Sequence, residues 1–182
     1  MNQTYWQEER HVIKDGLSQP LSWLLVVALC AWWWLQGSGT LEQGIVLATL
    51  LGLLTVIDIR SHILPDLLIL PLGIIGLIYH PQHWPAVLLG LAVFGSITAF
   101  YIWRYKRWGI GGGDTKLLAV LGAWVGISGL LPLILLASVS ALLYILISRR
   151  ARHLPLPFGP FLLAGGWLSL LYQDIFWRIL LP

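Results

Sequence analysis

Long apolar runs separated by short polar stretches dominate the chain after residue 19. The runs are continuous, whereas the strands of a membrane β-barrel alternate apolar and polar residues, so the pattern favours helices. A helix that crosses a bilayer needs about 20 residues, within a range of roughly 17–25. We therefore expect an all-α, polytopic transmembrane bundle of about seven spans. The predicted apolar segments are residues 20–36, 41–57, 65–80, 84–103, 115–128, 129–147 and 159–176.

Residues 1–19 differ from the rest of the chain because they are polar and carry charges of both signs. A secretory signal peptide would instead begin with a simply basic region and end at small residues. We expect residues 1–19 to be a cytosolic tail, with a short interfacial helix that carries Tyr5 and Trp6. Residues 20–182 are expected to form a single transmembrane domain.

The amino-acid composition also indicates that this domain lies in a lipid bilayer. Hydrophobic residues make up 58% of the 182 residues and charged residues only 10%, whereas soluble domains carry about 25% charged residues. The mean hydropathy is +0.80. Cys30 is the single cysteine of the sequence, which excludes an intramolecular disulfide and a cysteine-based zinc cluster. No pair of histidines has a spacing typical of metal ligands, so we expect no metal and no cofactor.

The basic residues indicate the orientation of the chain in the membrane. Loops 37–43, 80–84 and 128–129 contain no Lys or Arg. The tail and the alternate loops hold most of them, including Arg60 after the second segment. By the positive-inside rule these basic loops face the cytoplasm, which places the N-terminus inside. In a membrane protein, clustered Lys and Arg residues indicate the orientation of the chain rather than binding of nucleic acid. We therefore expect no nucleic-acid partner.

Two aspartates lie where an apolar run begins or ends. Asp58 ends the second run, and Asp114 opens the fifth after three glycines. Charged groups at membrane depth are costly and usually serve a function. The topology places both at the cytoplasmic ends of their segments, as a carboxylate pair that shares one proton would require. The alternative is that each aspartate caps a helix, with Asp114 as an N-cap and Asp66, after Pro65, in a first turn.

Three motifs occur in order along the chain. Residues 58–66 read DIRSHILPD, residues 111–116 read GGGDTK, and residues 156–161 read LPFGPF. Together they resemble the type IV prepilin peptidases, a family of membrane aspartyl proteases with a Gly-x-Gly-Asp motif. The resemblance covers about residues 45–170.

The resemblance implies that Asp58 and Asp114 are the catalytic aspartates and that residues 20–182 form a peptidase domain. Other positions of the motifs are candidates for binding substrate or supporting the site. They are Gly111, Gly113, Lys116, Asp66 and His62. Glycine permits left-handed backbone and close approach of a substrate. For Lys116 the alternative is an anchor at the membrane interface.

The resemblance also implies an activity and a location. The expected enzyme is an aspartyl endopeptidase of the bacterial cytoplasmic (inner) membrane. It cleaves the leader from type IV prepilins or pseudopilins, whose short basic leader precedes an apolar helix. Many relatives carry a cytosolic portion with two Cys-x-x-Cys pairs that accompanies N-methylation. This sequence has one cysteine, so we expect a short form whose resemblance does not extend to the methylase.

Two other functions fit a small helical membrane protein with paired carboxylates. A small ion-coupled transporter would use Asp58 and Asp114 as ion ligands, although transport sites usually lie near the bilayer midplane. A non-catalytic assembly factor would need neither carboxylate. Replacement of each aspartate by asparagine separates these functions from proteolysis.

Overall fold

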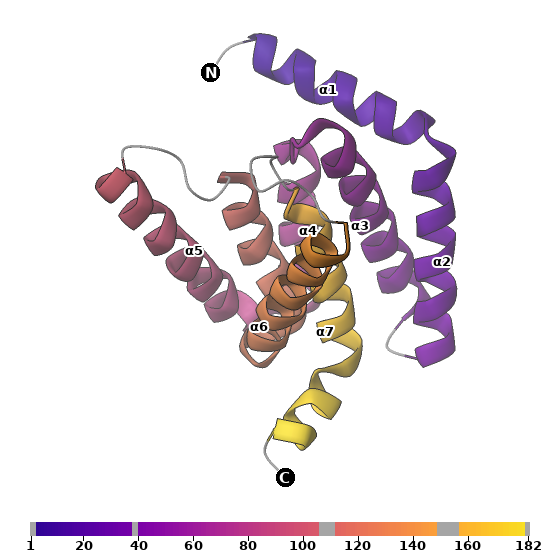
Figure 1. Ribbon diagram of the computed structural model, residues 1–182. Helices are drawn as coiled ribbons and strands as arrows, with labels where there is room; N and C mark the ends of the chain where they lie inside the picture. The colour runs from indigo at the N-terminus through magenta and orange to yellow at the C-terminus, as the bar shows by residue number, and fades with distance from the viewer. Residues whose placement is uncertain (1–2, 38–39, 106–111, 149–156, 181–182) are drawn as a thin grey trace. The chain divides into compact units, whose positions relative to one another are not determined.

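The computed structural model describes residues 3–37, 40–105, 112–148 and 157–180, and these residues are almost entirely helical (Figure 1). The chain divides into two compact units, residues 1–72 and 73–182, which are described separately below. The boundary falls inside one helix, α4. The elements are α1 (Gln3–Ser18), α2 (Pro20–Gln36), α3 (Leu41–Ser61), α4 (Asp66–Tyr79), η1 (Pro81–His83), α5 (Trp84–Tyr105), α6 (Gly112–Ser148) and α7 (Gly159–Leu180).

The polar N-terminal stretch of unit 1 forms α1, a regular helix that is bent by 70° from α2. Gln19 between them is extended, and Pro20 begins α2. Both features follow from the proline ring, which disfavours helical backbone in the preceding residue and fits the first turn of the following helix. Gly16 of α1 packs against the side chain of Ile57 in α3. The expected helix in the first 19 residues is therefore present, and it packs against the rest of unit 1.

Helices α2 and α3 form a hairpin whose turn is fixed by capping. The Thr40 side chain accepts a hydrogen bond from the Gln43 backbone N–H, and the Gln43 side chain accepts one from Thr40 N–H. This reciprocal pair is a capping box. Trp33 of α2 donates its indole N–H to Thr40 O at 3.2 Å, and its ring lies directly on Gly44. The tryptophan therefore packs inside the hairpin.

In unit 2 the backbones of α5 and α6 approach closely at two glycines. A Cβ atom at Gly90 would lie 3.0 Å from Ala119 Cα, and one at Gly122 would lie 2.9 Å from Ala86 O. Small residues allow this approach, and van der Waals packing of this kind drives helix association in lipid. The contact runs along the first half of α6, which begins with Asp114 in its first turn.

Helix α6 is not one continuous rod. Its 37 residues would extend roughly 55 Å, whereas the hydrocarbon core is about 30 Å thick. Gly126 has non-helical backbone angles (φ 70°, ψ −177°), which a residue with a Cβ rarely adopts. Helix α7 contacts both halves, because a Cβ at Gly166 would lie 3.0 Å from Leu121 and one at Gly165 would lie 2.7 Å from Leu133 O.

Those two contacts on α6 are separated by about 18 Å along a straight helix, yet they touch adjacent residues of α7. The chain must therefore fold back at Gly126, as Figure 1 shows for α6. This division agrees with the separate segments 115–128 and 129–147 expected from the sequence. The imidazole of His83 fills the space beside Gly126, and its Nδ1 lies 3.0 Å from Ala123 O.

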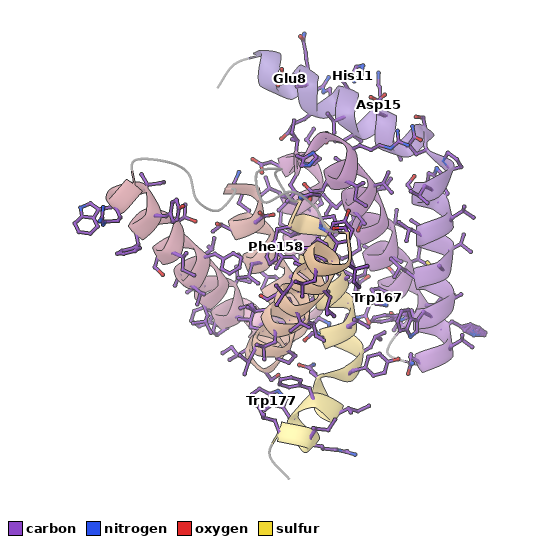
Figure 2. All side chains as sticks on the ribbon, in the orientation of Figure 1. Glu8, His11, Asp15, Phe158, Trp167 and Trp177 are labelled. Atoms are coloured by element: carbon purple, nitrogen blue, oxygen red, sulfur yellow. The ribbon has the colours of Figure 1, made fainter. Side chains whose placement is uncertain are left out.

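Polar contacts join α7 to the start of the second half of α6. Ser169 Oγ donates to Gly129 O at 2.7 Å, and Trp177 Nε1 donates to Ser128 O at 2.9 Å. Figure 2 shows Trp167 and Trp177 at successive levels of α7. Both acceptors lie just after the break at Gly126, and Ser128 O lacks its usual helical donor because residue 132 is proline, which has no N–H.

The helical, multi-pass membrane architecture predicted from the sequence is confirmed. Among the described residues, three helical stretches are long and apolar enough to cross a bilayer: Leu41–Ser61, Pro81–Arg104 and Gly112–Ser148. The pair formed by α1 and α2 would be a fourth if it counts as one broken span. Helix α2, with 17 residues, is at the lower limit, and α4 has 14. Seven spans with a cytoplasmic N-terminus therefore remain a prediction.

The close approach at Gly165 makes a stability prediction. Gly165→Ala is expected to destabilise the protein by about 1–3 kcal/mol, because the new methyl group meets the backbone at Leu133 O. The matched control is Gly95→Ala, where a Cβ meets nothing within 4 Å, and its change should stay within about 0.5 kcal/mol. Thermal unfolding in mild detergent measures both. Equal unfolding midpoints for the two variants would contradict the packing described for α6 and α7.

The orientation can be tested by labelling single cysteines in a Cys30→Ser background. Ser61→Cys, Tyr105→Cys and Ser148→Cys each place a thiol beside a basic loop, and Gln82→Cys places one in exposed η1. A membrane-impermeant thiol reagent added to intact cells should label only the Gln82→Cys protein, because basic loops resist translocation. Disrupted cells provide the control for reactivity. Labelling of the Tyr105→Cys protein from outside would contradict the topology.

Candidate active site

Asp58 lies in the last turn of α3, where a well-packed helix ends. Its side chain is buried, with 4% of its surface exposed, and the preceding residues of α3 from Leu47 onward are largely buried. The helix stops because His62 adopts the left-handed conformation (φ 54°) and donates its backbone N–H to Asp58 O at 3.0 Å. Such a left-handed residue is a common helix terminator, although it is usually glycine. The expected position of Asp58 at a helix end is therefore present.

The segment after Asp58 leads directly into α4. Leu68 and Ile69 both donate their N–H groups to Pro65 O, so the first turn of α4 forms around Pro65 and Asp66. Asp66 lies in the first turn, as the sequence suggested, where a carboxylate is favourable. Its own backbone N–H donates to Glu9 Oε1 of α1 at 2.9 Å.

Glu9 was missed by the sequence reasoning. Its side chain is buried, with 2% of its surface exposed, although it lies in a polar stretch that was expected to be a cytosolic tail. Its neighbour Glu8 is exposed. Adjacent glutamates in a mixed-charge stretch give no sequence signal that distinguishes them. Only the packing of α1 against the end of α3 and the start of α4 makes the difference.

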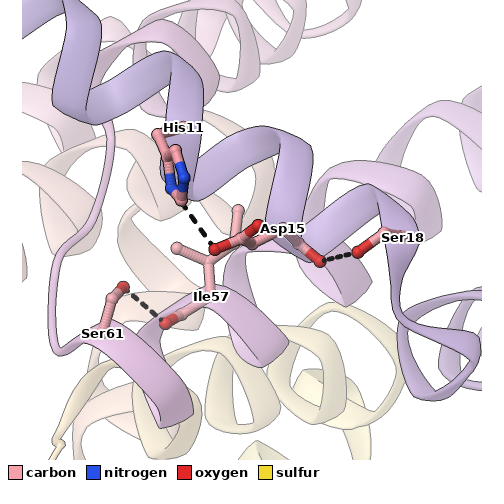
Figure 3. A network of polar contacts seen from close by, with 5 residues as sticks. All are labelled: His11, Asp15, Ser18, Ile57 and Ser61. Carbon is pink, nitrogen blue, oxygen red and sulfur yellow. Dashed lines mark hydrogen bonds and ion pairs between the residues drawn. The ribbon is translucent and has the colours of Figure 1, made fainter.

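A cavity of about 520 Å³ opens beside the last turn of α3. From α3 it is lined by Ile57, Arg60 and Ser61, from α1 by Val12, Asp15 and Gly16, and between α1 and α2 by Gln19. Figure 3 shows several residues at this cavity, where His11 Nδ1 lies 3.3 Å from Asp15 Oδ2 and Ser61 Oγ donates to Ile57 O at 2.8 Å. The cavity is therefore lined by the carboxylate-bearing Asp15 and by Arg60, which follows Asp58 by two residues.

Asp114 lies in the first turn of α6, and α6 begins at Gly112. The aspartate is thus inside the helix, whereas capping would have placed it just ahead of the first turn. Thr115 Oγ1 lies 3.5 Å from Thr98 Oγ1 of α5. Leu117, Leu118 and Ala119 are buried immediately after it. This half-buried carboxylate therefore sits on a rigid helix end that is held by α5.

The glycines before Asp114 differ from the expectation. Gly112 and Gly113 are helical, and the glycines with positive φ in the described chain are Gly37 and Gly126. A left-handed backbone at Gly113 is therefore not what the motif provides here. A Cβ at Gly112 would meet nothing within 4 Å, so packing alone does not require glycine at that position. Gly111 lies outside the described residues.

The remaining candidate residues occupy simple structural positions. His62 ends α3, and its side chain is exposed. Lys116 is exposed on α6, one turn into the helix. In the third motif, Phe158 O accepts hydrogen bonds from the N–H groups of Phe161 and Leu162 and so begins α7. Figure 2 labels Phe158 at this helix start. Leu156 lies outside the described residues.

No cluster of three or more His, Cys, Asp or Glu residues that could hold a metal ion occurs in the described part of the chain. Asp58 belongs to unit 1 and Asp114 to unit 2. Each is an aspartate at a helix terminus, one at the end of α3 and one at the start of α6. Chemically, two such carboxyl groups provide a base and an acid.

Comparisons with known proteins show which proteins the chain is similar to. The model of the type IV leader peptidase family matches residues 45–146, a range that contains both Asp58 and Asp114. The chain is 42% identical to a prepilin leader peptidase/N-methyltransferase of Xanthomonas campestris pv. campestris, over 84% of this chain and 58% of the relative. It is 35% identical to the protein of the same name from Aeromonas salmonicida, over 91% and 59% of the two chains.

A third relative of that name, from Pseudomonas aeruginosa, is 41% identical over 74% of this chain and 51% of its own length. The chain thus spans about half to three fifths of the length of these relatives. No solved structure matches it. The family model covers more than half of the chain, and the relatives align with most of it. The resemblance found in the three motifs is therefore confirmed, and the chain belongs to the type IV leader peptidase family.

Proposed function

We propose that this protein is a membrane-embedded aspartyl endopeptidase that removes the leader from type IV prepilins or pseudopilins, with Asp58 and Asp114 as its catalytic pair. The observation that carries the proposal is the position of the two aspartates. Each lies in a terminal turn of an apolar helix, within the range that matches the family. Other described carboxylates, such as Glu42 and Asp174, lie outside the motifs of the family.

The number of helices between Asp58 and Asp114 supports a common membrane face for the two residues. If α3 ends at the cytoplasmic side, α4 runs outward and α5 returns, so that α6 begins at the side where α3 ends. Each residue then lies at the edge of the hydrocarbon, where water can reach a carboxylate. A hydrolytic site needs water, and the bilayer centre does not provide it. The two units must bring the carboxyl groups together for catalysis.

The chemistry needs one ionised and one protonated carboxyl group. The ionised carboxylate takes a proton from a water molecule, whose oxygen attacks the carbonyl carbon of the scissile peptide bond. The protonated carboxyl group donates its proton to the carbonyl oxygen as the tetrahedral intermediate forms. The intermediate then collapses: the carboxyl group that took the proton from water gives it to the nitrogen, and the C–N bond breaks. A hydroxyl group of the intermediate returns its proton to the other carboxylate, so the amine leaves and the pair regains its starting state. Two carboxylates that share one proton act as a unit.

The substrate follows from this location. A prepilin carries a short basic leader ahead of an apolar helix, so the helix stays in lipid while the leader enters the cytosolic site. Electrostatic attraction between the leader and the anionic inner leaflet would keep the scissile bond near this face. The proposed compartment is the bacterial cytoplasmic membrane. The proposal concerns the peptidase step alone, and it assigns no N-methyltransferase activity to this chain.

Asp58→Asn and Asp114→Asn should each abolish leader cleavage, because an amide can neither accept the proton from water nor share it with its partner. The measurement is cleavage of a prepilin by the purified full chain in lipid, read by gel mobility and mass spectrometry. Asp174→Asn, the same substitution at an exposed position of α7, is the control and should cleave normally. Cleavage above a few per cent of the wild-type rate in either catalytic variant would exclude that residue from the pair.

Cleavage should also persist in excess EDTA, since the proposed mechanism activates water with carboxylates alone. The rate with EDTA is compared with the rate after addition of Zn²⁺ or Mg²⁺. Complete loss of cleavage on chelation, restored by a single metal, would instead indicate a metalloprotease.

A further inference from the structure

The buried carboxylate of Glu9 joins α1 to the segment that carries the first catalytic motif. Its Oε1 accepts the backbone N–H of Asp66 at 2.9 Å, across 57 positions of sequence. We propose that Glu9 is a positioning residue for the candidate active site, which holds the backbone between Asp58 and Asp66 in its catalytic conformation. This inference rests on the proposed function.

The energetic situation of Glu9 is unusual. The side chain is 2% exposed, and its Oε2 has no hydrogen-bond partner within the described residues. A carboxylate removed from water is costly unless other groups compensate. Here the compensation comes from the N-terminus of α4, which offers the Asp66 N–H and the positive end of the helix dipole. A hydrogen bond to an ionised acceptor is also stronger than a neutral one.

The bond fixes one end of a short segment whose other end is already fixed. After Asp58 the chain leaves α3 at His62, whose N–H donates to Asp58 O at 3.0 Å. It enters α4 at Asp66, whose N–H is held by Glu9. Residues 63–65 between them are not helical, and Pro65 O accepts the N–H groups of Leu68 and Ile69. Without Glu9, the segment would keep its bonds to α3 and α4 but lose its bond to α1.

Helix α1 is itself anchored, so it can act as a support. Gly16 packs against Ile57, the residue before Asp58, and Ser22 Oγ donates to Gly16 O at 2.8 Å. The contact with α3 and the bond to α4 therefore come from the same helix. Through α1, the residue before Asp58 and the residue that begins α4 are linked to one rigid element.

The other acidic residues of α1 do not share this position. Glu8 and Asp15 are exposed, and Asp15 lines the cavity beside the end of α3. A residue that recognised a basic leader by charge would have to be accessible to it. Glu9 is covered and bonded to backbone, so its role is to hold the chain. Glu8 provides a matched control with the same charge and nearly the same location.

The test is steady-state cleavage of a prepilin by the full chain in lipid. Glu9→Ala should lower kcat roughly 10- to 100-fold with KM changed less than about twofold, because catalytic groups are sensitive to small displacements. Glu9→Gln keeps an oxygen that accepts the Asp66 N–H, so it should retain kcat within about threefold. Glu9→Asp, whose side chain is one methylene shorter, should have a kcat between those of Glu9→Ala and Glu9→Gln. This variant tests the positioning role even if the Glu9→Ala protein does not fold. Glu8→Ala should behave as wild type.

Hydrogen–deuterium exchange provides a second readout that needs no activity. Backbone amides of residues 62–69 should exchange faster in the Glu9→Ala protein than in the Glu8→Ala protein, with α2 and α7 unchanged. The inference is overturned if Glu9→Ala and Glu9→Asp both cleave at the wild-type kcat. It is also overturned if Glu9→Gln raises KM strongly at constant kcat, which would indicate charge recognition of the leader. Failure of the proposed function is a separate result, since the wild-type chain would then not cleave or would cleave without Asp58 and Asp114.

Discussion

The absence of water inside a bilayer is the constraint on which this structure depends. Every backbone polar group within the hydrocarbon must find a partner in the protein, so the chain is helical almost throughout its described length. Polar side chains are costly at the same depth. The two aspartates of the proposed catalytic pair are accordingly at helix termini, in the last turn of α3 and the first turn of α6. Hydrolysis, which needs water, is possible only near these helix termini at the edge of the hydrocarbon.

The same constraint explains how the helices associate. Lipid tails are as apolar as leucine side chains, so burial of apolar surface does not drive helices together in a membrane. Glycines allow backbones to approach, as at Gly90 against Ala119 and at Gly165 against Leu133. The packing holds α5, α6 and α7 of unit 2 together. Asp114 thus lies at the start of a helix half whose backbone packs closely against α5 from Ala119 onward.

Glu9 illustrates a different device in unit 1. The first motif includes a short non-helical stretch between the end of α3 and the start of α4. Irregular backbone near a membrane needs support from elsewhere in the protein. Helix α1 supplies it through the Glu9 carboxylate and the Gly16 contact with Ile57. A polar helix outside the apolar core therefore contacts the segment proposed to carry the first catalytic aspartate.

The sequence by itself determined the class of fold and the apolar segments, and it supplied the two aspartates of the proposed pair. Apolar runs, sparse charge and three spaced motifs depend on residue type alone, and so does the division of residues 115–147 into two segments. The tertiary structure decided the rest. It placed Asp114 inside a helix, made Gly113 helical, and put the left-handed glycine of α6 at Gly126. It also buried Glu9 and left Glu8 exposed. These features depend on which helices meet, because burial and backbone strain are set by contacts between residues distant in sequence, and local pattern does not encode them.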